Sequence, residues 1–550
     1  MIEIITSDGI SLDLSPNAEF SLEMENPLFS SDSVSAAFST QITFSPTDKN
    51  RSVFGYIAAM MLAPQVKSLE ATLYFNGFPL MTGKLIYESI EEGELNYTFT
   101  ASSIDDRMQQ KICDIPITYG FGFSSEDDLW GGIRNDQLTG IHAPLMLNQA
   151  YTEAETSPGP SNDPKVYINY PFSPLPSDEI KKMPVIDILR ILQPARNLIR
   201  IDDGLAAAAE SLVIVGQYLL NAKKEPVSVW SRLGGAIDFA SYLPDITFLD
   251  LYNILAAIFS AAFFQDGSSL IMKSAASVLS APIVNIDDQV NDSFSSKFDA
   301  ASAYTLGYSG ETGDVYEINN LDADIEDGDM EEENGSWYDF LTANYDSGHY
   351  SNYHSVIHRN SGQCLSYKVM SPSSYGRMLI DCIYQKHEDF TEGESEEKKE
   401  VRIQAKPVKC VPSSLYHYPD RMYRVTPIIT IPDKADRGKD VLIGIYGDHQ
   451  LCDLGWVIDQ EDNSDKRLTG NISLSPADIF EAYHADFAAW MALDRQTVTV
   501  GLDLTPADVA AWRLFNRFYF RGRRWLCKKL TVTFAAGVET MESEGEFIEL

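Results

Sequence analysis

The sequence predicts a mainly β protein with α-helical insertions (α+β), divided into several domains. The opening 110 residues alternate apolar and polar side chains in short runs, which is typical of half-buried strands. Helix-start signals become frequent only further along the chain. The 550 residues allow several domains, and 44% apolar residues, with 11% aromatic, indicate a globular protein with a substantial core.

The N-terminal region predicts an antiparallel sheet. Ile2–Thr6 and Ile10–Leu14 flank Ser7-Asp8-Gly9, and a glycine after aspartate supplies the positive φ of a tight hairpin. One short helix is expected after Pro46, with Thr47 as its cap and Gly55 at its end. Further strands are expected at residues 20–25, 38–44, 69–75, 79–87 and 94–101.

The middle of the chain predicts loops followed by helix and strand pairs. Residues Tyr119–Met183, rich in Gly and Pro, are interpreted as an insertion. A helix is expected from Pro184 until Pro194, and another over Phe248–Phe263, capped by Thr247. Strands are expected at Asn197–Ile201, Leu270–Lys273, Met422–Ile431 and Val441–Tyr446.

The C-terminal region contains a local repeat, Leu474–Asp478 and Leu504–Asp508. Each copy places a hydroxyl at the cap, Pro at the first helical position and Asp in the first turn, so both predict helix starts. The chain is then expected to end in sheet, with strands at residues 497–502, 517–520 and 525–534.

Charge and cysteine content narrow the function classes. The 42 Lys and Arg against 80 Asp and Glu leave a net charge of −38, which repels phosphate backbones and anionic lipids.

Ile246–Phe264 is interrupted by polar residues and predicts a buried helix rather than a membrane span. Met1–Thr6 lacks the features of a signal peptide, which favours synthesis in a cytoplasm. Reduced thiols are expected because the cysteines show no CxxC spacing: Cys113, Cys364, Cys382, Cys410, Cys452 and Cys527.

The chemical motifs are weak. His354 and His358 have the spacing of a zinc-protease pair without its glutamate, which favours a polar loop. Asp322–Glu333 resembles a calcium loop, but Asp327 stands where glycine is needed, and an exposed acidic loop is the alternative. No GxSxG, Walker or GxGxxG motif supports catalysis, so we expect no enzyme, no metal and no cofactor. A glycoside hydrolase remains an alternative because its two carboxylates are paired in space, not in sequence.

A basic run lies near the C-terminus, and no acid interrupts the sequence from Val509 to Val538. It could dock an acidic neighbouring subunit, or its side chains could face solvent and pair with the chain's own carboxylates. Its members are Arg513, Arg517, Arg521, Arg523, Arg524, Lys528 and Lys529.

Three blocks covering about half of the chain resemble one family. The first runs from Asn26-Pro27-Leu28-Phe29 through Pro46–Arg51 with Phe54-Gly55 to Gly83-Lys84-Leu85. The second is Leu251–Met272, with Gln265-Asp266-Gly267. The third runs from Ile479–Trp490 through Leu502-Asp503-Leu504 to Phe520–Leu526. In this order they resemble tail and baseplate hub proteins encoded by tailed phages and prophages of gut bacteria.

The resemblance implies tail-tube-like antiparallel β-barrels and a trimeric ring that joins the tail tube or a distal tail protein to tail-tip, spike or receptor-binding proteins in the virion. It also implies passage of the genome without catalysis, and acidic walls would repel DNA. A glycan-binding module is a further alternative. Subunit contacts are expected at Asn26, Pro27, Leu28, Phe29, Asn50, Arg51, Phe54, Arg521, Arg523 and Arg524.

The expected domain map has five parts. A barrel at 1–115 is followed by a loop-rich insertion at 116–183, a helix-strand domain at 184–300, a second β-rich domain at 301–470, and a segment at 471–550 that completes a barrel.

Overall fold

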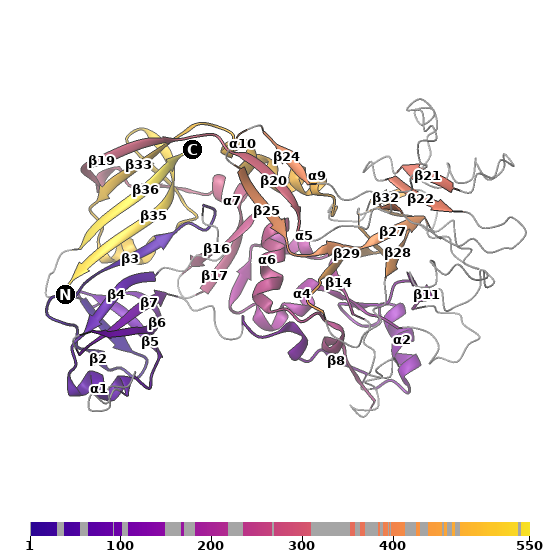
Figure 1. Cartoon of the computed structure of the whole chain (residues 1–550), viewed down its shortest axis with the longest axis horizontal. Helices are drawn as coiled ribbons and strands as arrows, with labels where there is room; N and C mark the ends of the chain where they lie inside the picture. Colours follow the sequence, from indigo (N-terminus) through magenta and orange to yellow (C-terminus); the bar gives the residue numbers. More distant parts are fainter. Residues whose placement is uncertain are drawn as a thin grey trace, which may run out of the picture.

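Figure 1 shows the computed structural model of the chain, in which two barrel-like units lie side by side at one end and a larger body of helices and small sheets forms the rest. The structure describes residues 2–29, 38–55, 64–91, 93–101, 108–120, 122–148, 167–169, 182–217, 235–266, 269–309, 353–357, 364–368, 383–384, 389–393, 395, 398–412, 425–429, 438–453, 456–458, 465–467, 473–536 and 541–550.

The first barrel is an antiparallel sheet that curls back on itself. Its strands follow the order β4-β7-β6-β5-β1-β2, and an antiparallel bridge between Leu14 and Phe44 brings the end of this sheet back to β4. Apolar residues at alternate positions fill the interior. The strands are β1 (Ile2–Thr6), β2 (Ser11–Leu12), β4 (Phe38–Phe44), β5 (Ser68–Phe75), β6 (Phe78–Glu91) and β7 (Glu94–Ala101).

Helix α1 (Asp48–Phe54) lies at one end of this barrel (Figure 1). The side chain of Thr47 accepts a hydrogen bond from the Asn50 N–H, and Gly55 ends the helix with a φ of 64°. Both features are the predicted ones, because a hydroxyl cap and a left-handed glycine satisfy the free backbone groups of a helix.

The second barrel-like unit combines the C-terminal strands with two strands from the middle of the chain. Parallel pairing joins β18 to β34, and antiparallel pairing joins β19 to β33. The order is therefore β18-β34-β35-β36-β33-β19. The strands are β18 (Ile283–Asn285), β19 (Val290–Asp299), β33 (Arg495–Leu502), β34 (Arg517–Phe520), β35 (Arg523–Ala535) and β36 (Glu542–Glu549).

Strand β3 (Glu19–Glu25) joins the two units. It pairs with β35 over its whole length, from Glu19 opposite Ala535 to Glu25 opposite Lys529, and also pairs with β4. One 13-stranded sheet thus runs through both units, whose interiors form a single apolar cluster. Figure 1 shows the C-terminal strands beside the N-terminal barrel. The two ends of the sequence therefore meet in one pair of coupled barrels, which we call the barrel unit.

The central body is built around a six-stranded sheet of β26-β29-β14-β12-β9 with β30 beside β29. Its strands are β9 (Ile141–His142), β12 (Val185–Asp187), β14 (Leu212–Val215), β26 (Lys406–Pro407), β29 (Leu442–Gly447) and β30 (Gln450–Cys452). Two three-stranded sheets accompany it: β13 (Ile199–Ile201), β17 (Ser269–Ser274) and β16 (Ala261–Asp266); and β24 (Phe390–Glu392), β20 (Ala303–Tyr308) and β25 (Lys398–Ile403).

Helices and short strands complete the body. The helices are α2 (Glu126–Arg134), α4 (Ile188–Ile191), α5 (Asp203–Ala209), α6 (Phe248–Ile258), α7 (Ala275–Leu279), α9 (Pro476–Ile479) and α10 (Ala485–Met491), and α11 (Pro506–Ala511) belongs to the barrel unit. The remaining strands are β8 (Thr118–Tyr119), β10 (Met146–Asn148), β11 (Tyr167–Ile168), β15 (Ile237–Asp238), β21 (Tyr353–Ile357), β22 (Cys364–Lys368), β23 (Ile383–Tyr384), β27 (Lys409–Pro412), β28 (Val425–Ile429), β31 (Trp456–Ile458) and β32 (Asp465–Arg467).

The predicted mainly β fold with α insertions and barrel-like units is confirmed, but two predicted helices are wrong in extent. Val185–Asp187 is the strand β12, because Val185 and Ile186 pair with β14 on one side and β9 on the other. The helix from Phe248 ends at Ile258, because Ser260 takes a φ of 47° that a helix cannot continue, and β16 begins at Ala261.

Two predicted loops also contain regular structure. The described part of residues 116–183 includes α2, β9, β10 and β11. His354 lies on β21, whereas His358 and Asp322–Glu333 lie outside the described residues. Cys113, Cys452 and Cys527 carry free thiols. None of the helices in the described ranges is long and apolar enough to cross a membrane.

Candidate assembly surface

Asn26, expected at a subunit contact, is buried inside the chain at the end of β3. Its side-chain amide donates hydrogen bonds to the carbonyl oxygens of Leu514 at 3.1 Å and Cys527 at 2.9 Å, and its backbone N–H donates to Lys528 at 2.8 Å. The residue is 1% exposed. Asn26 therefore fastens the end of β3 to the second barrel.

The residues after Asn26 enter the central body. Leu28 is buried in that body's core, and Pro27 is buried beside it. The Lys399 ammonium donates a hydrogen bond to the Leu28 carbonyl at 3.0 Å, and burial lowers the pKa of Lys399. The half-buried Phe29 ring lies 5.9 Å from the Trp490 ring. This segment is thus a joint between the barrel unit and the central body.

Asn50 and Phe54 hold α1 against the first barrel. The Asn50 amide donates to the Asp13 carbonyl at 2.7 Å, and its oxygen accepts from the Asp13 N–H at 3.0 Å. Phe54 stacks on Tyr97 with ring centroids 4.3 Å apart. Both residues are 0% exposed, whereas Arg51 is half-buried. Of the expected contact residues, Asn26, Pro27, Leu28, Asn50 and Phe54 are therefore already covered by this chain.

The three arginines expected at a contact are exposed around the β34–β35 turn. Arg521 adopts a φ of 48° in this turn, and its guanidinium lies 5.1 Å from the centroid of the Phe294 ring on β19. Arg523 forms an ion pair with Glu549 at 2.8 Å, so one of the three charges is neutralised within the chain. Arg521 and Arg524 add positive charge at the β34–β35 turn of the second barrel.

Exposed apolar side chains gather on the same barrel. Five of the ten large hydrophobic residues exposed in the described structure lie on β18, β19 and β34, and we call them the edge patch: Ile283, Val284, Phe294, Phe298 and Tyr519. Phe298 is 77% exposed. Because β19 pairs with β33 and with no other described strand, its second edge has free backbone groups as well.

Sequence reasoning missed this patch, although a signal was present. Phe294, Ser296 and Phe298 alternate with polar residues, which is a strand pattern with two large side chains on one face. These residues lie opposite Val500, Val498 and Gln496, respectively. Val498 and Val500 are buried in the core, whereas Phe298 extends past it.

The face of the same sheet that points away from the core residues Val498 and Val500 is acidic. Residues directly opposite each other in antiparallel strands share a face, and the registers of β3, β35, β36, β33 and β19 therefore place these charges together. Lys297, Lys528 and Lys529 lie among seven carboxylates that we call the acidic face: Glu19, Glu23, Glu25, Asp299, Glu542, Glu544 and Glu546.

The lysines of this face are neutralised in place. Lys529 pairs with Glu23 at 2.5 Å and Glu25 at 3.4 Å, and Lys297 pairs with Glu546 at 3.5 Å. Lys528 pairs with Asp299 at 3.4 Å and with Glu546 at 3.3 Å. Burial lowers the pKa of Lys529, but the two glutamates outweigh burial and raise it. The remaining carboxylates give the face a net negative charge.

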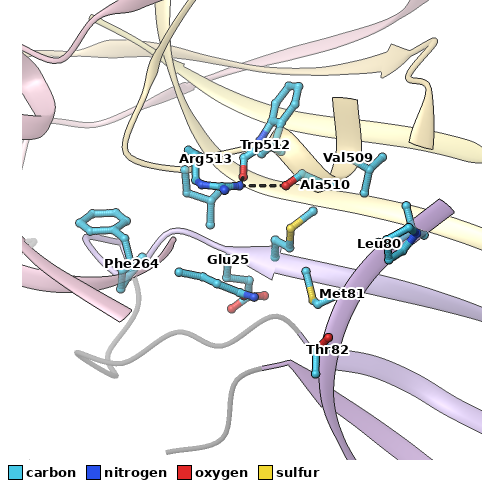
Figure 2. Close-up of a pocket in the computed structure, with 14 residues that line it drawn as sticks. Glu25, Leu80, Met81, Thr82, Phe264, Val509, Ala510, Trp512 and Arg513 are labelled. Carbon is cyan, nitrogen blue, oxygen red and sulfur yellow. Dashed lines mark hydrogen bonds between the residues drawn. The ribbon is translucent and has the colours of Figure 1, made fainter. Parts of the chain in front are cut away.

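A cavity of about 190 Å³ lies where β3, β6, α11 and β16 meet (Figure 2). Apolar side chains, including Phe264 and Trp512, make up much of its wall. Arg513 donates to the Ala510 carbonyl at 2.9 Å, as drawn in Figure 2, and pairs with Asp266 at 3.0 Å. Among the described residues of this wall, Glu25 alone carries a carboxylate, so the two-carboxylate arrangement of glycoside hydrolases is absent from it.

A second cavity, of about 350 Å³, lies beside Leu28 and Lys399 in the central body. Its described wall also contains a single carboxylate, that of Glu400. Across the described ranges, no group of three or more His, Cys, Asp or Glu side chains could hold a metal ion.

Comparison with known proteins yields matches among solved structures. No family model and no curated protein matches the chain. A prophage MuSo2 43 kDa tail protein from Shewanella oneidensis matches at 9% identity and a TM-score of 0.34, covering 100% of this chain and 98% of its own. A tail protein from Neisseria meningitidis matches at 9% identity and a TM-score of 0.33, covering 100% and 96%.

A third match is the prophage tail protein gp18 from Listeria monocytogenes, at 8% identity and a TM-score of 0.31, covering 99% of this chain and 94% of that one. All three are described as tail proteins, which is the class that the sequence blocks resemble. The overlap in shape is loose at these TM-scores.

Proposed function

We propose that this chain is a structural protein of a phage tail: a hub that connects the tail tube to the tail tip and forms part of the DNA conduit. It is made in the host cytoplasm and acts in the virion without catalysis. The observation that carries the proposal is the 13-stranded sheet, which couples two barrel-like units through the pairing of β3 with β35. Two coupled barrels in one chain suit repeated packing around a cylinder.

The subunits of this hub form a closed ring of three copies. The edge patch and the exposed Arg521 and Arg524 supply apolar contact area and positive charge on the second barrel. Burial of the Phe298 side chain alone would contribute about 1.5 to 3 kcal/mol to each contact. The net charge of −38 provides acidic surface on a neighbouring copy for the arginines to meet.

The acidic face lines the conduit in this proposal. DNA carries phosphates along its whole length, and a wall on which carboxylates outnumber lysines repels them within about 10 Å at moderate salt. The wall would therefore let the genome pass without holding it.

Electron microscopy of the purified, assembled protein tests the proposal. We expect a threefold ring with an open channel in which Glu23, Glu544 and Glu546 face the lumen. A monomer at micromolar concentration, or a ring whose lumen is lined by Arg521 and Arg524, would contradict it. Incubation with a panel of polysaccharides should release no sugar, since the hub has no glycosidase activity.

A further inference from the structure

His142, on β9 in the central body, is held between two carboxylates. Its Nδ1 lies 3.0 Å from Asp136 Oδ1, and its Nε2 lies 2.9 Å from Asp187 Oδ1. The side chain is 13% exposed. A neutral imidazole donates from one nitrogen only, so the other would direct a lone pair at a carboxylate oxygen. The doubly protonated imidazolium satisfies both contacts.

The turn between β29 and β30 closes over this histidine. The Tyr446 ring stacks on the His142 ring, with centroids 3.9 Å apart and planes 24° apart. The Tyr446 hydroxyl donates to Asp136 Oδ1 at 3.0 Å, and His449 Nδ1 lies 2.8 Å from Asp136 Oδ2. Asp136 thus contacts the side chains of His142, Tyr446 and His449. Tyr446 lies 310 residues from Asp136 in the sequence.

We propose that these five residues form a proton-operated clasp that holds the end of β29 and the β29–β30 turn over His142: His142, Asp136, Asp187, Tyr446 and His449. When His142 is protonated, its charge holds Asp136 and Asp187 together and attracts the Tyr446 ring. When His142 loses its proton, one carboxylate contact becomes repulsive and the turn is released, while β29 stays paired with β14 and β26. The clasp lies outside the barrel unit, so it stands independently of the proposed hub function.

The charges around His142 favour the cation. Asp136 faces His142 from the turn after α2, and Asp187 faces it from β12. Asp448 and His449 belong to the turn between β29 and β30. Arg190, on α4, packs against Gly140 close to Asp187. The carboxylates outnumber the single guanidinium.

The direction of the pH effect follows from the pKa. Burial lowers the pKa of His142, but the hydrogen bonds and charges of Asp187 and Asp136 outweigh burial and raise it above 6.5. A raised pKa means that the clasp's contribution is complete below pH 6.5 and is lost as the pH rises through the pKa of the folded protein. The turn is therefore held below the pKa of His142 and released above it.

Hydrogen–deuterium exchange of the full chain between pH 6 and pH 9.5 tests the clasp. After correction for intrinsic exchange, protection of the turn amides 447–450 should fall by up to tenfold per pH unit above the pKa of His142. His142→Gln should give low protection without this pH dependence, whereas His449→Gln should keep it, because the contacts of His142 with both carboxylates remain. Constant protection in the unmodified protein, or an unchanged pH dependence in His142→Gln, would overturn the proposal.

Nuclear magnetic resonance of ¹³C-histidine-labelled protein provides a test that needs no His142 variant to fold. The His142 ring should titrate above pH 6.5, and Asp187→Asn should lower its pKa by removing one of the two carboxylates. Titration at or below 6.5 in the unmodified chain would refute the clasp.

Discussion

The hydrogen-bond partners of His484 favour a neutral imidazole ring, whereas those of His142 favour the protonated ring. Its Nε2 lies 3.1 Å from the Ile258 carbonyl, to which it donates, and its Nδ1 accepts from the Tyr304 hydroxyl at 2.7 Å. The side chain is 0% exposed in a π-helical turn at Phe480–His484. Burial lowers its pKa to about 4. No carboxylate is needed, because the neutral imidazole already has one donor and one acceptor satisfied.

We predict that His484 makes the central body sensitive to acid. Its pKa is lowered from 6.5 to about 4, so its contribution is complete above pH 6.5 and is lost as the pH falls toward 4. The loss amounts to about 3 kcal/mol at pH 4. Urea denaturation of His484→Gln at pH 7 and pH 4.5 should show a smaller acid-induced loss than the unmodified chain. Equal losses in both proteins would contradict the neutral assignment.

The two buried asparagines show what sequence can reveal at the scale of a residue. Asn26 and Asn50 were singled out by their place in the family-like blocks, yet both amides satisfy carbonyl groups inside the chain. The partner Cys527 lies 501 residues from Asn26 in the sequence. The sequence around an asparagine does not distinguish an amide at a subunit interface from an amide in the core. The hydrogen-bond partners that distinguish the two lie hundreds of residues away, as Cys527 does from Asn26.

At the scale of the element, local chemistry predicted helix starts well. Thr47, Thr247 and Thr505 all cap helices with their side chains, and the latter two form complete capping boxes with an aspartate. Ser475 also begins a helix, but its side chain makes no capping hydrogen bond. The positions of helix starts depend on neighbouring residues, which a sequence contains directly.

We predict that Thr505→Ala lowers the stability of the barrel unit by about 1 kcal/mol, because it removes the hydroxyl that accepts from the Asp508 N–H and donates to the Asp508 carboxylate. Ser475→Ala is the matched control, since this cap lacks a side-chain hydrogen bond, and should change stability by less than about 0.5 kcal/mol. Thermal denaturation followed by circular dichroism measures both. Equal effects would show that the capping box does not stabilise α11.

Phe54→Ala should destabilise the first barrel by about 3 to 5 kcal/mol, because it leaves a cavity between Phe44 and Tyr97 at the barrel end. Ser52→Ala on the exposed side of α1 is the control and should change stability by less than about 0.5 kcal/mol. Chemical denaturation measures the difference. If Phe54→Ala left stability unchanged but weakened assembly, the assignment of Phe54 to the chain's own core would be wrong.

Helix lengths were predicted less well, for a physical reason. The apolar run that begins at Val185 fits a helix by periodicity, but two flanking strands offer it hydrogen bonds and burial on both sides. Likewise, Phe263 and Phe264 continue an apolar pattern but belong to β16, which pairs with β17. Tertiary pairing overrides local preference in short apolar runs.

At the scale of the whole molecule, the contact that couples the two barrels, the pairing of β3 with β35, could not be predicted from the sequence. The barrel-like folding of both ends could be predicted from alternating strands, but not the pairing of β3 with β35, in which Ser21 and Thr533 share a hydrogen bond across 512 residues. The closing strands β18 and β19 were missed for the same reason, since their partners β34 and β33 lie more than 200 residues further along the chain.

We predict that Phe298→Ser weakens assembly at least tenfold without unfolding the chain, because Phe298 is exposed and loses about 1.5 to 3 kcal/mol of contact energy. Phe78→Ser is the matched control, since Phe78 is 41% exposed on the first barrel and lies outside the edge patch. Sedimentation velocity over a concentration series measures both. Assembly that is insensitive to Phe298→Ser would place the subunit contact elsewhere.

The most direct test of the hub account is the native mass and symmetry of the purified full-length chain. Native mass spectrometry combined with cryo-electron microscopy should find particles of three times the chain's mass, with threefold symmetry and the acidic face around an open channel. Particles that remain single chains at every concentration up to tens of micromolar, with the edge patch exposed to solvent, would contradict the account.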